Sequence, residues 1–353
     1  MANQDILCGW NEEHTKALGN DNLFVQHRMM ESGLFSDENL IRILDRHPVA
    51  DMTVSTMGRD KMNYEWFECN RNGATGEQLL DVVKRGHLWI NVMRLMDHHS
   101  DLRKLINDAY DELESRCPGL EATHRTANLL ISSPSAIVYY HVDTPLNILW
   151  HLRGEKKCWV YPLRSPFVSQ SDLEDLHAGQ RPEDMRYLAE FDDEAEAYEM
   201  VGGDMVTWAQ NTPHRVENTS GLNISISTEH LTTRARRQIN VHLANRMLRK
   251  KLGCKNLSSS PDGFLASAKV AGSRAARLIT RFLPTKAEEK FKYPVKYQVN
   301  VEAEGGISSL EGAEASTATL ESVERATQEL TGILASDAAE EAVSLQDTES
   351  TSV

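Results

Sequence analysis

The stretch Tyr139-Tyr140-His141-Val142-Asp143, read with Pro213-His214-Arg215 further along the chain, decides the fold. It supplies two imidazoles and one carboxylate, a set typical of an iron(II) site with open coordination positions. His141 and Asp143 are two residues apart, and residues i and i+2 of a β-strand point to the same face, so both side chains can reach one ion. His214 must then come from a second strand folded back beside the first. Structural zinc usually takes four ligands, whereas three ligands leave room for a cosubstrate and oxygen.

The residues around this stretch have the pattern of short β-strands. Strands are predicted over 129–131, 136–140, 146–152, 156–161, 197–201, 204–210, 213–218 and 222–230. Arg153-Gly154-Glu155 is predicted as the turn of a hairpin. Residues 170–197 are polar and acidic, and we interpret them as an insertion over the rim with a helix near 171–178. About seven short strands in about 100 residues indicate an antiparallel barrel or jelly roll.

The first 130 residues have mostly helical patterns. Ser36 precedes a predicted helix that starts with acidic residues, and 76–86 is predicted as a short helix that ends at Gly86. A further helical pattern is predicted to open at Leu88 and to continue through Tyr110. Between these segments, residues 51–68 are rich in Thr, Val, Met and aromatic residues and favour one or two strands.

The C-terminal part divides by charge. Residues 231–300 contain 16 Lys and Arg against 3 Asp and Glu, whereas 301–353 contain one Arg against 12 acids. Helices are predicted over 232–252, ended by Gly253, and over 264–283. After Asn300 the chain loses its aromatic residues and is predicted to be a largely disordered tail. We expect the basic helices to pack on the acidic core and to complement its charge; the alternative is that they meet an acidic partner.

The motifs together resemble the JmjC-type, cupin-like iron(II)/2-oxoglutarate oxygenases, most closely their compact bacterial members. They are Ser132-Ser133-Pro134, His141-Val142-Asp143, Asn147, Arg153-Gly154-Glu155-Lys156, Gly203-Asp204-Met205-Val206 and Pro213-His214-Arg215-Val216-Glu217-Asn218. The resemblance covers roughly 20–250. It implies an α+β fold with a double-stranded β-helix core over 131–230. This core would carry a helix-rich part over 1–130, basic helices over 231–300 and the acidic tail over 301–353.

The resemblance also implies roles for individual residues. His141, Asp143 and His214 would be the catalytic metal ligands. Lys156 stands where the family has a basic anchor for the distal carboxylate of 2-oxoglutarate, and Asn147 matches an asparagine that helps to hold this cosubstrate. Tyr139 is predicted to share the His141 face and to offer a hydroxyl. Some relatives carry a cosubstrate-binding Thr three residues before the first His, where this chain has Val138, so Tyr139 or Tyr140 would have to replace that contact.

The implied activity is that of an Fe(II)- and 2-oxoglutarate-dependent dioxygenase. It would hydroxylate a protein side chain or a small metabolite, or demethylate an N-methyl group. Two alternatives stay open. One is a catalytically silent cupin-like protein that binds a ligand or partner, a reading to which Val138 lends weight. The other is a metal-dependent cupin enzyme, such as an isomerase, that does not use 2-oxoglutarate.

Composition bounds the partners and the compartment. The net charge of −14 excludes a uniformly basic nucleic-acid binder, although the 231–300 segment leaves a local contact open. No run of about 18 apolar residues predicts a membrane span. The five cysteines are scattered and form no Cys-x-x-Cys pair, a pattern typical of reduced thiols in a cytoplasmic protein. Apolar positions such as Leu243, Met247 and Leu248 in the C-terminal helices favour a homodimer as one further hypothesis.

Overall fold

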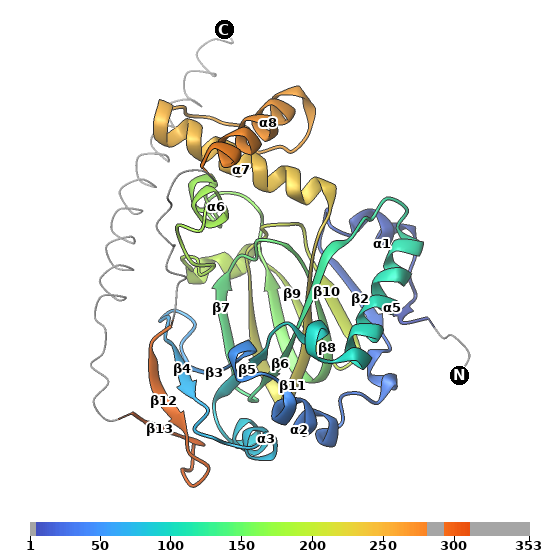
Figure 1. The fold of residues 1–353 in the computed structure, drawn as a ribbon, viewed down its shortest axis with the longest axis vertical. Coiled ribbons are helices and arrows are strands. Elements are labelled where there is room, and N and C mark those ends of the chain that lie inside the picture. The colour runs from blue at the N-terminus through green and yellow to red at the C-terminus, as the bar shows by residue number, and fades with distance from the viewer. Residues whose placement is uncertain (1–4, 281–292, 311–353) are drawn as a thin grey trace. The chain divides into compact units, whose positions relative to one another are not determined.

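Two long antiparallel strands, β8 (Leu146–Val160) and β11 (His214–Leu231), are the central pair of the fold (Figure 1). The computed structural model describes residues 5–280 and 293–310. The strands that flank the central pair are β6 (Thr123–Ser132), β7 (Ile137–His141), β9 (Glu196–Val201) and β10 (Asp204–Thr207).

Each central strand belongs to a larger sheet along one half of its length and to a smaller sheet along the other half. The first part of β8 pairs with β10 and its second part with β9, while the start of β11 pairs with β7 and its end with β6. The larger sheet has the order β1-β2-β10-β8-β11-β6-β5-β3-β4-β12-β13, and β9-β8-β11-β7 forms the smaller one. Two sheets that share both long strands in this way form a double-stranded β-helix, so the predicted α+β jelly-roll fold is confirmed.

An apolar cluster fills part of the space between the two sheets. This buried cluster draws on both sheets and comprises Leu149, Cys158, Val160, Met200, Val206, Trp208 and Val216. The opposite face of β8 carries Ile148, Trp150 and Leu152, which belong to the main core together with residues of the N-terminal helices. In the first half of β8 the odd-numbered Leu149 points into the space between the sheets, and in the second half the even-numbered Cys158 does so. The alternation of inward and outward side chains along β8 therefore shifts by one residue between its halves.

Gly154 marks this shift, and the hairpin predicted around it is wrong. Residues 146–160 form one continuous strand, because β11 pairs with β8 on both sides of the glycine. Gly154 has φ +87°, and a Cβ there would lie 2.6 Å from the carbonyl oxygen of Leu222. A glycine can bend the strand at this point, where a side chain would collide with the partner. The separate strands predicted over 213–218 and 222–230 are likewise one bent strand.

The first 130 residues contain more strand than predicted. The helices are α1 (Glu12–Ala17), α2 (Asp37–Arg46), α3 (Gly76–Arg85), α4 (Leu95–His98) and α5 (Ser100–Arg116). The strands are β1 (Leu7–Cys8), β2 (Leu23–His27), β3 (Met52–Met57), β4 (Trp66–Asn70) and β5 (Leu88–Val92). The Ser36 cap of α2 and the two strands within 51–70 agree with prediction. The helical pattern predicted from Leu88 through Tyr110 is wrong at its start, because 88–92 alternates buried and half-buried positions and pairs with β3 and β6. Its later part is helical, as α4 and α5.

The C-terminal part is helical and then returns to the sheet. Its helices are α6 (Gln170–His177), α7 (Thr233–Leu252) and α8 (Gly263–Thr280), and Gly253 ends α7 as predicted. After residues 281–292, β12 (Val295–Val299) pairs with β4, and β13 (Ile307–Ser309) pairs with β12. Residues 301–310 are therefore ordered, which the prediction of a tail from 301 missed; 311–353 lie outside the described residues. None of the described helices has the length and apolar character needed to cross a membrane.

Candidate metal centre

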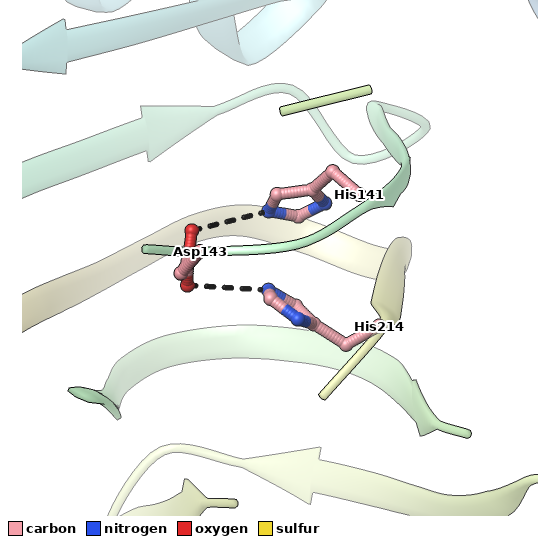
Figure 2. Close-up of side chains that lie close together, drawn as sticks. All are labelled: His141, Asp143 and His214. Carbon is pink, nitrogen blue, oxygen red and sulfur yellow. Dashed lines mark ion pairs between the residues drawn. The ribbon is translucent and has the colours of Figure 1, made fainter. Parts of the chain in front are cut away.

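The three predicted ligands meet where β7 and β11 lie side by side. His141 is the last residue of β7, and His214, the first residue of β11, is paired with it in the sheet register. Asp143 follows His141 by two residues. Figure 2 shows the two imidazole rings next to each other, each directed at one oxygen of the Asp143 carboxylate. The two rings therefore come from neighbouring strands that are 73 positions apart in sequence.

The distances suit a shared ion. His141 Nε2 lies 3.8 Å from Asp143 Oδ1, and His214 Nε2 lies 3.5 Å from Asp143 Oδ2. One ligand atom from each residue lies within 4.8 Å of the others, and among the described residues this is the only group of three or more such side chains. Two ligands about 2 Å from one ion are separated by about 3 to 4 Å, so little movement is needed to close the set.

Backbone carbonyls fix the tautomer of both histidines. His141 Nδ1 lies 2.7 Å from the carbonyl oxygen of Tyr139, and His214 Nδ1 lies 3.1 Å from that of Thr212. A carbonyl only accepts hydrogen bonds, so each Nδ1 carries the proton and each Nε2 keeps its lone pair. Metal-binding histidines are typically held in this way by an outer hydrogen bond. The arrangement orients both lone pairs toward Asp143 before any ion is bound.

Burial sets the charges of the ligand set. Desolvation raises the pKa of Asp143 and lowers that of His214 well below its usual range. Within the described part of the chain, the ion-pair partners of Asp143 are the two imidazoles, and no Lys or Arg is among them. A buried carboxylate without a cationic partner is costly, and a divalent cation would supply the missing positive charge. The donor set therefore fits a divalent metal ion.

Lys156 is a buried ammonium on β8, where it stands opposite Asn218 of β11, the strand that carries His214. Its side chain is 5% exposed, and its Nζ donates to Ser225 Oγ at 2.8 Å. No carboxylate forms an ion pair with it among the residues described here, and burial lowers its pKa to about 8. The next lysine, Lys157, points out of the barrel and pairs with Glu199. An unpaired cation inside the barrel is a binding group for an anion.

Two residues that the sequence prediction left without a role orient Lys156. His151 Nε2 lies 3.0 Å from the carbonyl oxygen of Gly154, so Nε2 carries the proton and Nδ1 accepts. Ser225 Oγ lies 3.0 Å from this Nδ1 and therefore donates to it while accepting from Lys156. Burial and the Lys156 charge lower the pKa of His151 to about 3, which keeps the ring neutral. The hydrogen bonds therefore run in a fixed order: Lys156 donates to Ser225, and Ser225 donates to His151.

Asn147 and Tyr139 occupy different surroundings. Asn147 is buried inside the barrel, and its Nδ2 donates to Ser227 Oγ at 2.8 Å. The ring of Tyr139 belongs to a separate cluster with Met57, Ala136 and Ile137 and contacts Tyr64 at 4.8 Å between ring centroids. Tyr139 contributes its carbonyl to His141, while the cosubstrate contact of its hydroxyl stays a prediction. Val138 packs against the cluster between the sheets.

Further carboxylates lie around the ligand set. Desolvation raises the pKa of Glu183 and of Glu229, and the negative charge of Asp143 is the next largest cause for both. Sequence reasoning gave neither residue a role, because they lie 40 and 86 positions after Asp143 in segments without a motif. Acidic groups that repel each other in a crowded site attract a cation.

Arg215 was quoted in the motif but given no role, and it is one of the most buried side chains. It is 1% exposed, its Nη2 lies 2.7 Å from Asp192 Oδ2, and its Nε donates to Tyr161 at 2.7 Å. Its guanidinium also lies 3.5 Å from the centroid of Trp159. Asp192 belongs to the acidic insertion and also accepts from Lys61. Arg215 thus fastens the insertion to the strand that carries His214.

We expect Arg215→Met to destabilise the protein by about 3 kcal/mol, because breaking a buried ion pair leaves its partner uncompensated. Urea unfolding followed by circular dichroism measures this change. Arg164→Met is the matched control, since Arg164 forms an exposed pair with Glu194 of the same insertion and should change stability by less than about 1 kcal/mol. Equal effects of the two substitutions would show that Arg215 has no special structural role.

The basic C-terminal segment complements acidic residues of the fold, as expected. Arg249 pairs with Glu174 of α6, whose side chain is 1% exposed, and Arg246 and Lys250 both pair with Asp175. Figure 1 shows α6 beneath the α7–α8 pair. Much of the charge at the end of α7 is therefore satisfied within the chain. The acidic residues of 311–353 lie outside the described part of the chain.

Comparisons with known proteins gave structural likenesses alone. No family model and no curated protein matches the chain. The crystal structure of Escherichia coli YcfD is similar over 75% of this chain and 66% of its own, with 14% identity and a TM-score of 0.44. The structure of the same ribosomal oxygenase in complex with cobalt and 2-oxoglutarate is similar over 74% of this chain and 64% of its own, with 13% identity and a TM-score of 0.41.

A further likeness is to SnoK, a non-haem, alpha-ketoglutarate-dependent carbocyclase from nogalamycin biosynthesis. It extends over 64% of this chain and 85% of that one, with 14% identity and a TM-score of 0.38. This chain spans just under two thirds of the length of the YcfD chains. The double-stranded β-helix itself rests on the strand pairing described above.

Proposed function

We propose that this protein is an Fe(II)- and 2-oxoglutarate-dependent oxygenase. The observation that carries the proposal is the combination of two features on the neighbouring strands β7, β11 and β8. One is a set of three ligands in which hydrogen bonds to backbone carbonyls fix the tautomer and orientation of both imidazoles. The other is a buried ammonium that has no anionic partner among the described residues. Three protein ligands suit iron with open positions, and the ammonium suits a carboxylate of the cosubstrate.

In this proposal His141, Asp143 and His214 hold the iron, and Lys156 anchors the distal carboxylate of 2-oxoglutarate. Bound iron supplies the oxidative decarboxylation of 2-oxoglutarate to succinate and CO2, with transfer of one oxygen atom of O2 to a C–H bond of the substrate. The protein orients the groups: the carbonyls of Tyr139 and Thr212 keep both Nε2 atoms free of protons. The apolar cluster between the sheets excludes water around Lys156 and strengthens its pairing with an anion. Asn147 and Tyr139 are proposed as further cosubstrate contacts.

The substrate is proposed as a protein side chain or a small metabolite, with hydroxylation as the outcome, or demethylation where the carbon is an N-methyl. The free thiols of all five cysteines support a cytoplasmic location, because disulfides are rare there. A homodimer through the C-terminal helices stays a hypothesis. Met247 is partly exposed on α7, and Phe264 and Leu265 are exposed at the start of α8.

The test is conversion of 2-oxoglutarate to succinate by the purified chain supplied with ferrous iron and air, with and without candidate substrates. We expect succinate formation that requires iron and is absent in a His141→Ala variant. An anaerobic titration adds a reading that does not need turnover, since the iron–2-oxoglutarate chelate has a weak visible band. No band and no succinate would leave a barrel with another function.

The same measurements separate the alternatives. A silent binding protein, the reading that Val138 favours, would show neither the band nor turnover. A cupin enzyme that does not use 2-oxoglutarate would bind iron but gain no thermal stability from 2-oxoglutarate beyond that given by succinate or citrate. Lys156 argues against this last reading, because a buried cation without a partner needs an anionic ligand.

A further inference from the structure

The segment from 293 to 310, here called the C-terminal arm, is attached to the far edge of the larger sheet. Its strand β12 runs parallel to β4, beside which Figure 1 shows it. The guanidinium of Arg85 donates to the carbonyl oxygens of Val301, Ala303 and Glu304, which fixes the turn of the arm. These contacts make the arm a part of the fold and set the position of its first residue, Tyr293.

Tyr293 reaches from the arm to the neighbourhood of the metal centre. Its hydroxyl donates to Asp184 Oδ2 at 2.9 Å in a partly buried contact. Desolvation, together with the negative charge of Asp184, raises the pKa of the neighbouring Tyr64. The ring of Tyr293 also lies 6.1 Å from that of Trp66, measured between centroids. Three segments that are distant in sequence therefore meet at Asp184.

Asp184 belongs to the segment 181–187, here called the flanking segment, which runs beside β7. The amide of Val142 donates to the carbonyl of Glu183 at 3.0 Å, and the amide of Met185 donates to that of Tyr140 at 3.0 Å. Between these bonds, Asp184 stands opposite His141 in an isolated antiparallel bridge. The two hydrogen bonds thus lie on either side of His141, and Asp143 directly follows the second of them.

The flanking segment pairs with the edge of β7 over a short stretch of backbone. β7 is the last strand of the smaller sheet, and an edge strand leaves its outer backbone groups without partners unless another segment covers them. Here the cover is short, with one bridge and two backbone bonds, and short pairings open readily. A charge-assisted hydrogen bond from a rigid sheet edge can hold such a segment in place.

We propose that Tyr293 is a positioning residue of the metal centre. Through Asp184 it holds the flanking segment against β7, and so fixes the backbone of His141 and Asp143 and the place of Glu183 beside them. The proposal rests on the proposed function for its catalytic meaning. Its physical content is that the C-terminal arm stabilises the edge that carries two of the three metal ligands.

The experiment compares amide hydrogen exchange in the metal-free full chain and in Tyr293→Phe, which removes only the hydroxyl. We expect exchange at Val142 and Met185 to accelerate about tenfold, as the loss of a hydrogen bond to a charged group predicts, with β8 amides unchanged. Tyr297→Phe is the matched control, because Tyr297 lies on the same arm and packs on Phe67. In Tyr293→Phe the Co(II) titration midpoint should also move to a higher concentration.

A second variant, Asp184→Asn, tests the acceptor, and the double variant should exchange no faster than Tyr293→Phe alone. Unchanged exchange at both amides in Tyr293→Phe and in Asp184→Asn would overturn the proposal, as would an equal effect of Tyr297→Phe. Because exchange is measured without metal, these outcomes are independent of catalysis. A chain that shows the exchange effect but neither iron-dependent succinate nor the visible band would refute the proposed function and leave the structural role of Tyr293 in place.

Discussion

His214→Ala and Asp143→Asn are each expected to weaken binding of a divalent metal ion by at least about 1000-fold, or about 4 kcal/mol. Loss of an outer hydrogen-bonding partner typically costs 10- to 100-fold, and loss of a direct ligand should exceed this. His214 supplies one of the two imidazoles of the group of three, which is the only such group among the described residues. Asn keeps the shape of Asp143 but removes the negative charge that the ion would neutralise.

Anaerobic titration with Co(II), followed by its visible absorption, measures these affinities without turnover. His87→Ala is the matched control, because His87 is bonded to Ser135 and lies outside the ligand set, so its loss should leave Co(II) affinity unchanged. Circular dichroism at low temperature checks that each variant is folded. Tight Co(II) binding by His214→Ala would mean that the ion, if any, sits elsewhere.

The ligand set was predictable because two of its members depend on local geometry alone. His141 and Asp143 share a face through the period of a strand, which any β-rich stretch provides. His214 was predicted from residue type, motif and the need for a third ligand, and the structure pairs it with His141. The cation at Lys156 was likewise predicted from its place after Gly154, although the predicted turn was wrong.

What the sequence could not show depends on pairing between distant segments. Gly154 has the signature of a hairpin turn, and only the presence of β11 along both halves of β8 makes it a bend instead. Leu88–Val92 is apolar enough for a helix, and its pairing with β3 and β6 decides for a strand. The hydrogen-bonded partners of Lys156 depend on the pairing of β8 with β11. No local sequence pattern relates Ser225 or His151 to this lysine. Tyr293 is 109 positions from Asp184.

Lys156→Met is the second substitution with a large expected effect. It should weaken binding of 2-oxoglutarate to the iron-loaded protein by about 100-fold, since truncating one partner of a buried charge pair costs about 2 to 5 kcal/mol. Metal affinity should stay unchanged, because Lys156 is not a ligand. Without 2-oxoglutarate the variant should be more stable than the parent, since an uncompensated buried ammonium is replaced by an apolar side chain of similar length. Lys157 is the adjacent lysine and points outward, so Lys157→Met is the control for both the 2-oxoglutarate affinity and the stability measurement.

The pH dependence of cosubstrate binding then identifies the ammonium as the binding group. The ionised form of Lys156 binds the carboxylate, and burial places its pKa at about 8 in the free protein, below that of an exposed lysine. The binding form therefore predominates below pH 8, is half populated at about pH 8 and is lost as the pH rises further. Affinity should then fall with a slope that approaches tenfold per pH unit about one unit above this pKa, until the pKa of the complex is reached. Lys156→Arg keeps a charge that does not titrate in this range and should give a flat profile, whatever its affinity. Lys156→Met should also be flat, at low affinity. A parent profile that is flat to pH 9.5 would show that another group holds the cosubstrate, because Lys156, with a pKa of about 8, loses its charge over this range.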